Sequence, residues 1–417
     1  MKRNNTFFTA KNALYLIAFY VVLLVLRMHN GNFYLDDSYD YLQVAQKIAN
    51  GDFFSTHDEI VSKRPFLYPL FLLLSFGFNP YVILFLQAVL LFLTFCLFGK
   101  ILAHFKITAT NKLMFLLIVT PSVFIYAQLV MSEILAAFLL MLLLYFFVID
   151  FSFKKIKYIQ ILLLLLVFTK PVFYPFAFIN TALMIYYCFR KKQFTFWIFA
   201  PILTLLLYTN YNERKFGYRH FSSIENYNLV QYNLYYFKSF SESKTEADRW
   251  LNEVNASIST KDFAQKNMIL KHIAHKEISG HFFSYAAYHC LTGIRGVFDP
   301  GRFDLMTFRK KEDGKQGFLE ILNGNKSVKT LFSDSSSLFI YGFLLLIFIA
   351  LLVKYFYFIK YFLSNKLHFY EVYFLVLILY YILVTGPVNC SRYMMPFQLI
   401  IIIFTLKSFH QIKTNAD

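Results

Sequence analysis

Long apolar segments alternate with short polar ones along most of this chain. The apolar segments lie at residues 12–28, 80–102, 112–127, 130–149, 157–169, 172–189, 194–211, 337–358, 368–385 and 393–409. A helix needs roughly 20 mostly apolar residues to cross a bilayer, and the short segment at 157–169 would be tilted or sunk into the bundle. The pattern predicts an all-α polytopic membrane protein with about ten transmembrane helices.

Two shorter amphipathic or apolar segments follow the first predicted span. Residues 38–50 place apolar side chains on one face of a helix, which Asn50 and Gly51 would end. The apolar part of residues 65–78 is only about 14 residues long, which is too short to span a membrane comfortably. We expect both segments to be interfacial helices in the first outer loop, the second being interfacial or re-entrant.

The composition changes between residues 213 and 336, where polar and charged residues dominate. Helical periodicity at 247–258 and 263–278 predicts a mostly helical domain there. We therefore expect three parts: a transmembrane module at 1–212, an extracytoplasmic domain at 213–336 and C-terminal transmembrane helices at 337–417.

Composition and charge agree with a membrane location and fix an orientation. The 417 residues are 58% hydrophobic and only 16% charged, and Lys and Arg exceed Asp and Glu by 41 to 24. The basic residues cluster at 100–112, 150–157, 190–192 and 354–366. Cytoplasmic loops are basic in this way, so the charge does not indicate nucleic acid, and both termini are expected inside. Treating 65–78 as a full span would invert every later loop.

This orientation predicts a multi-pass protein of the cell inner (plasma) membrane whose unusual charges share the extracytoplasmic side. These charges are Asp36, Asp37, Asp40, Lys63, Arg64, Glu133, Lys170 and Arg392. Charged groups beside a bilayer are costly, so they are usually solvated, paired or functional. No small-residue cleavage site follows residues 12–28, so we expect this segment to be a retained helix.

Carboxylates and cations gathered at a membrane surface fit the transfer of a group from a lipid-borne phosphate. A carboxylate would accept a proton from the acceptor, and cations would stabilise the departing phosphate. Simpler roles are also open: Asp37 as a helix cap, Asp36 as a solvated loop residue, Glu133 as a cap or as the partner of a lysine, and the cations as anchors at the headgroups. Asp36 and Asp37 also offer oxygen ligands for a divalent cation, but we expect no metal or other cofactor.

Several short motifs together resemble the polyprenyl-phosphate-sugar-dependent glycosyltransferases of the GT-C fold, in particular family 39, the protein O-mannosyltransferases and the lipid A aminoarabinose transferases. The matching residues are Asp37, Tyr41, Ala45 and Gly51, then Arg64-Pro65 and Tyr68-Pro69, and later Glu133, Lys170, Arg392, Tyr393 and Pro396. The family's acidic pair is Asp-Glu, whereas this chain has Asp-Asp or Asp-Ser. This departure leaves open which of Asp36 and Asp37 is catalytic, and the spacing to Tyr41 favours Asp37.

The resemblance implies an inverting transfer of a sugar from a polyprenyl-phosphate donor to a glycolipid, a cell-surface glycan or a protein. Asp37 or Asp36 would be catalytic together with Glu133, which would orient the acceptor or a cation. The donor phosphate would be held by basic residues, and a lipid groove would be lined at the second interfacial helix. These residues are Arg64, Lys63, Lys170 and Arg392 for the phosphate, and Tyr68 and Pro69 for the groove.

Two other classes of protein fit the same pattern less closely. A transporter or flippase for lipid-linked glycans should show paired halves with interrupted helices and a site at mid-membrane. A polysaccharide polymerase or ligase would typically have a large outer loop late in the chain, as at 213–336, but the acidic first outer loop argues against it.

Overall fold

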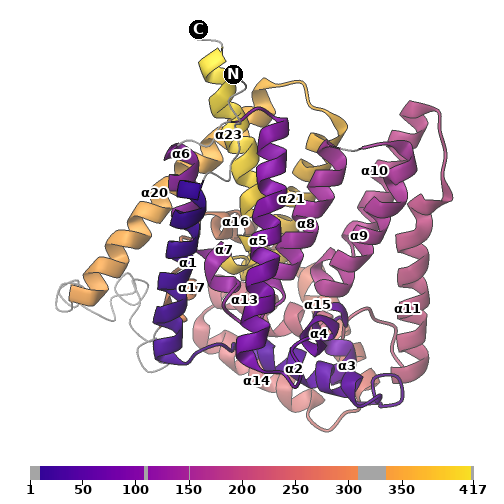
Figure 1. The fold of residues 1–417 in the computed structure, drawn as a ribbon. Coiled ribbons are helices and arrows are strands. Elements are labelled where there is room, and N and C mark those ends of the chain that lie inside the picture. Colours follow the sequence, from indigo (N-terminus) through magenta and orange to yellow (C-terminus); the bar gives the residue numbers. More distant parts are fainter. Residues whose placement is uncertain (1–9, 108–110, 150, 309–334, 415–417) are drawn as a thin grey trace.

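The computed structural model describes residues 10–107, 111–149, 151–308 and 335–414, and within them all regular structure is helical (Figure 1). The first half contains α1 (Ala10–Asn30), α2 (Asp36–Ala49), α3 (Ile60–Lys63), α4 (Leu67–Leu73), α5 (Pro80–His104), α6 (Asn111–Ile118), α7 (Ser122–Tyr126), α8 (Glu133–Val148), η1 (Phe153–Lys155), α9 (Ile156–Thr169), η2 (Pro171–Phe173), α10 (Phe176–Lys191), η3 (Phe196–Phe199) and α11 (Ala200–Phe216). The second half contains α12 (Ile224–Asn228), η4 (Leu229–Leu234), α13 (Tyr235–Ser241), α14 (Lys244–Ile258), α15 (Phe263–Gly280), α16 (Phe282–Val297), α17 (Arg302–Met306), α20 (Ser335–Ser364), α21 (Phe369–Thr385), η6 (Gly386–Val388), α22 (Ser391–Met394), η7 (Met395–Phe397) and α23 (Gln398–Thr414).

Six segments among the described residues are long and apolar enough to cross a membrane: Lys11–Asn30, Pro80–His104, Pro171–Lys191, Ile340–Ser364, Phe369–Val388 and Ser391–His410. The all-α, multi-pass character expected from the sequence is therefore confirmed. The other four predicted spans are helical but shorter or interrupted. They are 112–127, which is divided into α6 and α7, 130–149 (α8, 16 residues), 157–169 (α9, 14 residues) and 194–211 (η3 and α11). The number of ten spans stays a prediction.

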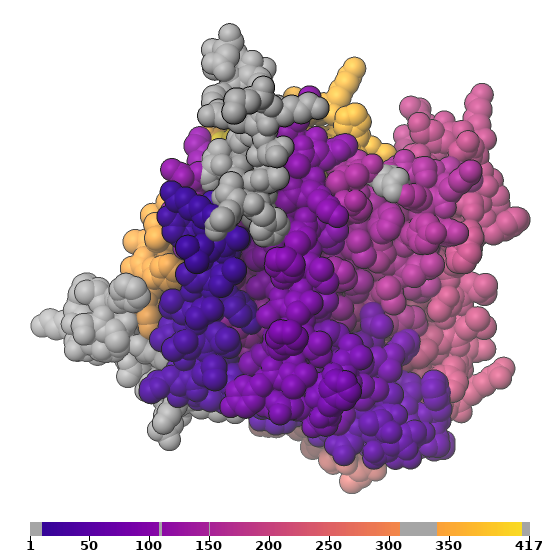
Figure 2. All heavy atoms as spheres, viewed as in Figure 1, coloured from indigo at the N-terminus to yellow at the C-terminus, as the bar shows by residue number. Residues whose placement is uncertain are grey.

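Burial separates the central helices from the peripheral ones. α8 packs between α5 and α9, and α23 packs along α20. By contrast, α1 keeps apolar side chains such as Ile17 and Val25 about three-fifths exposed, at 60% and 59%. In Figure 2, α1 forms part of the molecular surface, with α5 beside it. Because acyl chains are as apolar as these side chains, such a surface suits a helix that faces lipid.

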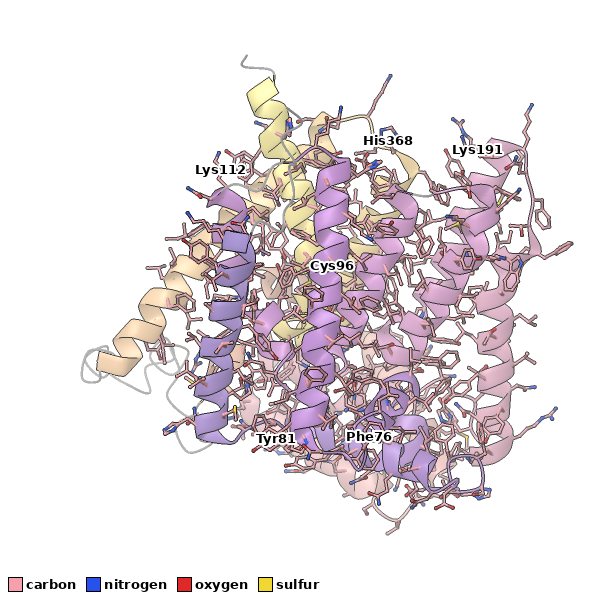
Figure 3. All side chains as sticks on the ribbon, in the orientation of Figure 1. Phe76, Tyr81, Cys96, Lys112, Lys191 and His368 are labelled. Carbon is pink, nitrogen blue, oxygen red and sulfur yellow. The ribbon has the colours of Figure 1, made fainter. Side chains whose placement is uncertain are left out.

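The bundle has two distinct ends, which Figure 3 marks by labelled residues. Lys112, Lys191 and His368 lie at the end we call the upper end, and Phe76 and Tyr81 lie at the lower end. α2, α4 and α14 also lie at the lower end (Figure 1). The basic loops around Lys112 and Lys191 are thus separated by the length of the bundle from the acidic helix α2.

The two short helices predicted in the first outer loop are present with different bounds. α2 begins at Asp36, two residues before the predicted start, because the Ser38 hydroxyl accepts a hydrogen bond from the Leu35 amide at 2.9 Å. It ends before Asn50, and Gly51 has a φ of 79°, which glycine adopts readily. The second helix covers only Leu67–Leu73 of the predicted 65–78 and packs against α2.

Helices α12 to α17 make up most of the part of the chain predicted as an outer domain. α14 and α15 correspond to the periodic segments at 247–258 and 263–278, while residues 309–334 of the predicted domain lie outside the described residues. A separate hydrophobic cluster joins η4, α13, α14, α15 and α16, and its members are Val230, Leu234, Phe237, Val254, Leu270, Ala274 and Tyr285. These helices therefore have a small core of their own.

Candidate functional site

One continuous network of ion pairs connects α2, α8 and α22 with the last residue of α3 and with the residues that follow α3 and α9. Its centre is Asp37, at the start of α2. One carboxylate oxygen of Asp37 accepts a hydrogen bond from Arg64, and the other accepts one from Arg392. Since Arg64 and Arg392 are far apart in the chain, the tertiary fold alone brings these two cations to one carboxylate.

Asp40, one helical turn after Asp37, extends the network toward solvent. Its carboxylate lies 2.8 Å from Lys63 Nζ and 3.0 Å from Arg64 Nη2. The Lys63 side chain is 38% exposed, whereas that of Arg64 is only 11% exposed. Lys63 therefore occupies the rim of the site and Arg64 its interior.

Glu133 anchors the other side of the network and is completely buried. Its Oε1 accepts hydrogen bonds from Arg392 Nε at 2.7 Å and from Lys170 Nζ at 3.0 Å. Its Oε2 is buried and has no hydrogen-bond partner among the described residues. Burying an ion pair is tolerated only when the charges are well matched, so Glu133 fixes the positions of both cations.

Local sequence explains why these side chains point into the site. Arg64 and Lys170 each precede a proline and adopt extended backbones, with φ, ψ of −117°, 131° and −139°, 123°. Proline disfavours the helical conformation of the preceding residue, so each cation lies where a helix has just ended. Asp37 and Glu133 occupy the first turns of α2 and α8, where the helix dipole favours negative charge.

The electrostatics of Asp37 reflect its two guanidinium partners. Burial alone would raise the pKa of Asp37, but the charges of Arg392 and Arg64 outweigh it and lower the pKa from 3.8 to about 2. The pKa of Arg64 is correspondingly raised, since Tyr41, Asp37 and Asp40 outweigh its burial. At neutral pH this pair is fully charged.

Buried contacts of two tyrosines, Tyr41 and Tyr68, support the side of the network that contains Arg64. The Arg64 guanidinium lies 5.4 Å from the ring centre of Tyr41, whose hydroxyl is 2.9 Å from Ser132 Oγ. The ring of Tyr68 packs edge-on against Tyr41 at 4.9 Å, and its hydroxyl donates to Gln87 Oε1 at 2.7 Å. These contacts fix the wall of the site that carries Arg64.

The remaining predicted site residues lie close to the network but outside it. Asp36 is exposed at the start of α2 and has no ion-pair partner in the described part of the chain. Tyr68 and Pro69 are buried on α4, in the packing between α4 and α2. Their predicted role in a lipid groove stays a prediction.

Sequence reasoning did not assign roles to Asp40 or to a second buried carboxylate, Asp304 of α17. The three-residue spacing from Asp37 would have placed Asp40 on the same helix face. Asp304 accepts a hydrogen bond from Tyr126 at 2.7 Å, and burial raises its pKa to about 7. No local motif marks Asp304, because its partners come from distant helices.

The seven side chains of the network are Asp37, Asp40, Glu133, Lys63, Arg64, Lys170 and Arg392. Four cations face three carboxylates, which leaves one surplus positive charge for an anion. No group of three or more metal-binding side chains occurs in the described ranges. Family models, curated proteins and solved structures were each compared with the chain, and none of them matches it.

Proposed function

We propose that this protein is an integral membrane glycosyltransferase. It transfers a sugar from a polyprenyl-phosphate-linked donor to a glycolipid, a cell-surface glycan or a protein, with inversion, on the extracytoplasmic side of the plasma membrane. The observation that carries the proposal is the ion-pair network itself, which joins a partly exposed carboxylate to several cations at one end of an apolar bundle. Five of its seven members also belong to the motifs that resemble the GT-C enzymes, namely Asp37, Arg64, Glu133, Lys170 and Arg392.

The proposed chemistry divides the network between the two substrates. Arg64, Arg392 and Lys170 bind the donor phosphate, since guanidinium and ammonium groups form strong charge-assisted hydrogen bonds with phosphate oxygens. The acceptor hydroxyl attacks the anomeric carbon, the bond from that carbon to the phosphate oxygen breaks, and the polyprenyl phosphate leaves as a monoester. The hydroxyl proton passes to Asp37.

Asp37 is a weak base while both arginines hold it, because its pKa is about 2. A phosphate that binds Arg64 and Arg392 competes with Asp37 for the same donors. Loss of these hydrogen bonds raises the basicity of Asp37 when the donor is in place. Glu133 is then a positioning residue, which keeps Arg392 and Lys170 in the site during this exchange.

The placement of the charges favours transfer over transport. Transporters of lipid-linked substrates bind near the middle of the membrane. Here α2 and its carboxylates lie at the lower end of the bundle, the end that carries Phe76 and Tyr81 (Figures 1 and 3). The phosphate of a lipid donor would reach a site at the end of the bundle without leaving its leaflet.

The test is donor binding by purified protein in nanodiscs. We expect undecaprenyl phosphate to raise the melting temperature of the wild type, because a ligand at about 100 times its Kd stabilises a protein by about 2.7 kcal/mol. Arg64→Ala should lose most of this shift. Asp37→Asn should keep it or enlarge it, because that substitution removes the carboxylate that competes for the arginines.

Two controls make the result specific. Undecaprenol has the same chain without the phosphate and should not stabilise the protein. Lys191→Ala removes a cation at the upper end of the bundle and should leave the shift unchanged (Figure 3). Equal stabilisation of the wild type and Arg64→Ala, or none of either, would refute the proposed phosphate site.

A further inference from the structure

A row of exposed aromatic side chains runs along α12, η4 and α13 and passes beside the site at η4. Tyr227, Tyr232 and Tyr236 are 44%, 42% and 42% exposed, and Phe240 is 74% exposed. The opposite face of the same helices carries Val230 and Leu234, which are fully buried in the small core. The row is therefore the solvent-facing side of an ordered element.

A π-helical segment keeps this row on one face. The exposed residues are spaced by five positions from Tyr227 to Tyr232 and then by four to Tyr236 and Phe240. In a regular α-helix a spacing of five would turn the second side chain by about 140° from the first. η4 (Leu229–Leu234) adds one residue to the turn, which brings Tyr232 back into line. Such bulges are uncommon and frequently lie at functional sites.

The row meets the ion-pair network near Tyr232. The pKa of Tyr232 is raised, first by burial and then by the charges and hydroxyls around it, which include Asp37 and Asp36. η4 also packs against η6 (Gly386–Val388), the turn that leads to α22 and Arg392. A chain-like molecule whose terminal unit lies at Tyr232, and whose remainder lies along Tyr236 and Phe240, therefore has that end near Asp37.

The tyrosines of the row present both their ring faces and their hydroxyl groups for binding. The rings of Tyr227 and Tyr232 are 6.3 Å apart at 71°, and those of Tyr232 and Tyr236 are 6.5 Å apart at 43°, so neither pair stacks face to face. The hydroxyls of these three tyrosines have no hydrogen-bond partner in the part of the chain that the structure describes. Neighbouring Tyr235, in contrast, donates to Asp248 at 2.7 Å.

We propose that Tyr227, Tyr232, Tyr236 and Phe240 form a subsite for a carbohydrate chain, which makes a glycan the acceptor of the proposed transfer. The inference rests on the proposed function. Sugar rings present a face of C–H groups bordered by hydroxyls, so they pack on flat aromatic rings and hydrogen-bond to the phenol groups. The ring spacing is comparable to the length of one pyranose unit. With the glycan chain along Phe240 and Tyr236 and its terminal unit at Tyr232, flanked by Tyr227, the terminal hydroxyl reaches Asp37.

The alternative is that these exposed tyrosines lie in the membrane–water interface, where Tyr is enriched, and bind no glycan. The protein offers a control in Tyr81, which is 59% exposed at the lower end of the bundle but lies on α5, outside the row. An interface role should treat Tyr81 and the row alike. A glycan subsite should depend on the row alone.

The experiment is saturation-transfer-difference NMR on the full chain in nanodiscs. The probes are uncharged hexasaccharides of glucose, mannose, galactose and N-acetylglucosamine at millimolar concentration. We expect magnetic saturation to pass from the protein to the ring C–H protons of at least one probe, both in the wild type and in Tyr81→Leu. The double variant Tyr232→Leu/Tyr236→Leu should bind about tenfold more weakly. Tyr232→Phe/Tyr236→Phe keeps the rings and should retain most of the binding.

The outcomes separate this inference from the proposed function. The subsite is overturned if no hexasaccharide receives NMR saturation from the wild type. It is also overturned if the wild type and the double leucine variant give equal saturation transfer. Stabilisation by undecaprenyl phosphate should be unchanged in the double leucine variant, which also shows that it folds. If the protein binds glycans but undecaprenyl phosphate does not raise its melting temperature, the glycan subsite stands and the proposed lipid-phosphate donor is refuted.

Discussion

Substituting Glu133 by Gln tests the innermost part of the network. Glu133 is fully buried and touches Arg392 at 2.7 Å and Lys170 at 3.0 Å. At an effective dielectric constant of about 20, a pair of charges at about 4 Å is worth about 4 kcal/mol before desolvation. Breaking a buried pair by removing one partner costs about 3–5 kcal/mol, because the remaining charge is left buried and uncompensated. We expect Glu133→Gln to destabilise the protein by about this amount.

The assay is thermal or denaturant unfolding in detergent, with Glu253→Gln as the control. Glu253 is exposed on α14, so its substitution should change the free energy of unfolding by less than about 0.5 kcal/mol. Arg392 keeps its ion pair with Asp37 in this variant, so among the described residues Lys170 is the cation left without its carboxylate. Adding Lys170→Met to Glu133→Gln removes that cation and should recover part of the loss. The reasoning is refuted if Glu133→Gln is as stable as the control, or if the double variant is less stable than the sum of the single changes predicts.

Three further predictions concern Asp37 and its neighbours. Asp37→Asn should abolish sugar transfer from a radiolabelled polyprenyl-phosphate donor while expression and donor binding persist. Retained sugar transfer would assign the catalytic base to Asp36 or refute a carboxylate base in this loop. Because the folded pKa of Asp37 is lowered from 3.8 to about 2, its ion pairs contribute about 2 kcal/mol above pH 4, and this contribution disappears as the pH falls toward 2. The difference in melting temperature between the wild type and Asp37→Asn should therefore be constant from pH 5 to 7 and shrink in acid; a constant difference at all pH values would contradict it. Both oxygens of Asp37 already accept hydrogen bonds from arginines, so EDTA should leave activity unchanged, and activity lost on chelation would restore a metal site at Asp36 and Asp37.

The apolar pattern predicted most helices but not the break in 112–127. An apolar run has the same hydropathy whether the helix continues or stops, and here α6 ends at Ile118 and α7 begins after Pro121. Proline was the local signal, since it removes a backbone donor and disfavours helix in the preceding residue. The π-helical turn of η4 left no such signal, because one extra residue in a turn resembles ordinary irregularity in the spacing.

Six of the seven side chains of the network were predictable as site residues, but Asp40 and the geometry of the network were not. Charges beside apolar segments are rare enough to be noticed, and the predicted orientation placed them on one side. Which carboxylate pairs with which cation depends on tertiary packing: Asp37 and Arg392 are 355 positions apart. The packing of α22 and η7 against α7 and α8 brings Arg392 to both Glu133 and Asp37.

The charge count of the network is consistent with each step of the proposed transfer. Before the reaction, four cations and three carboxylates leave one positive charge, which matches the single negative charge of a polyprenyl phosphodiester. During the reaction the phosphate becomes a monoester with a charge of about −1.5 to −2. The proton accepted by Asp37 removes one carboxylate charge at the same time, so the surplus rises to two as the phosphate charge rises. The buried part of the site thus stays close to neutral throughout, which limits the cost of forming charge in an apolar environment. In the structure Asp37 lies between Arg64 and Arg392, which is where the proposed transfer would place the phosphate.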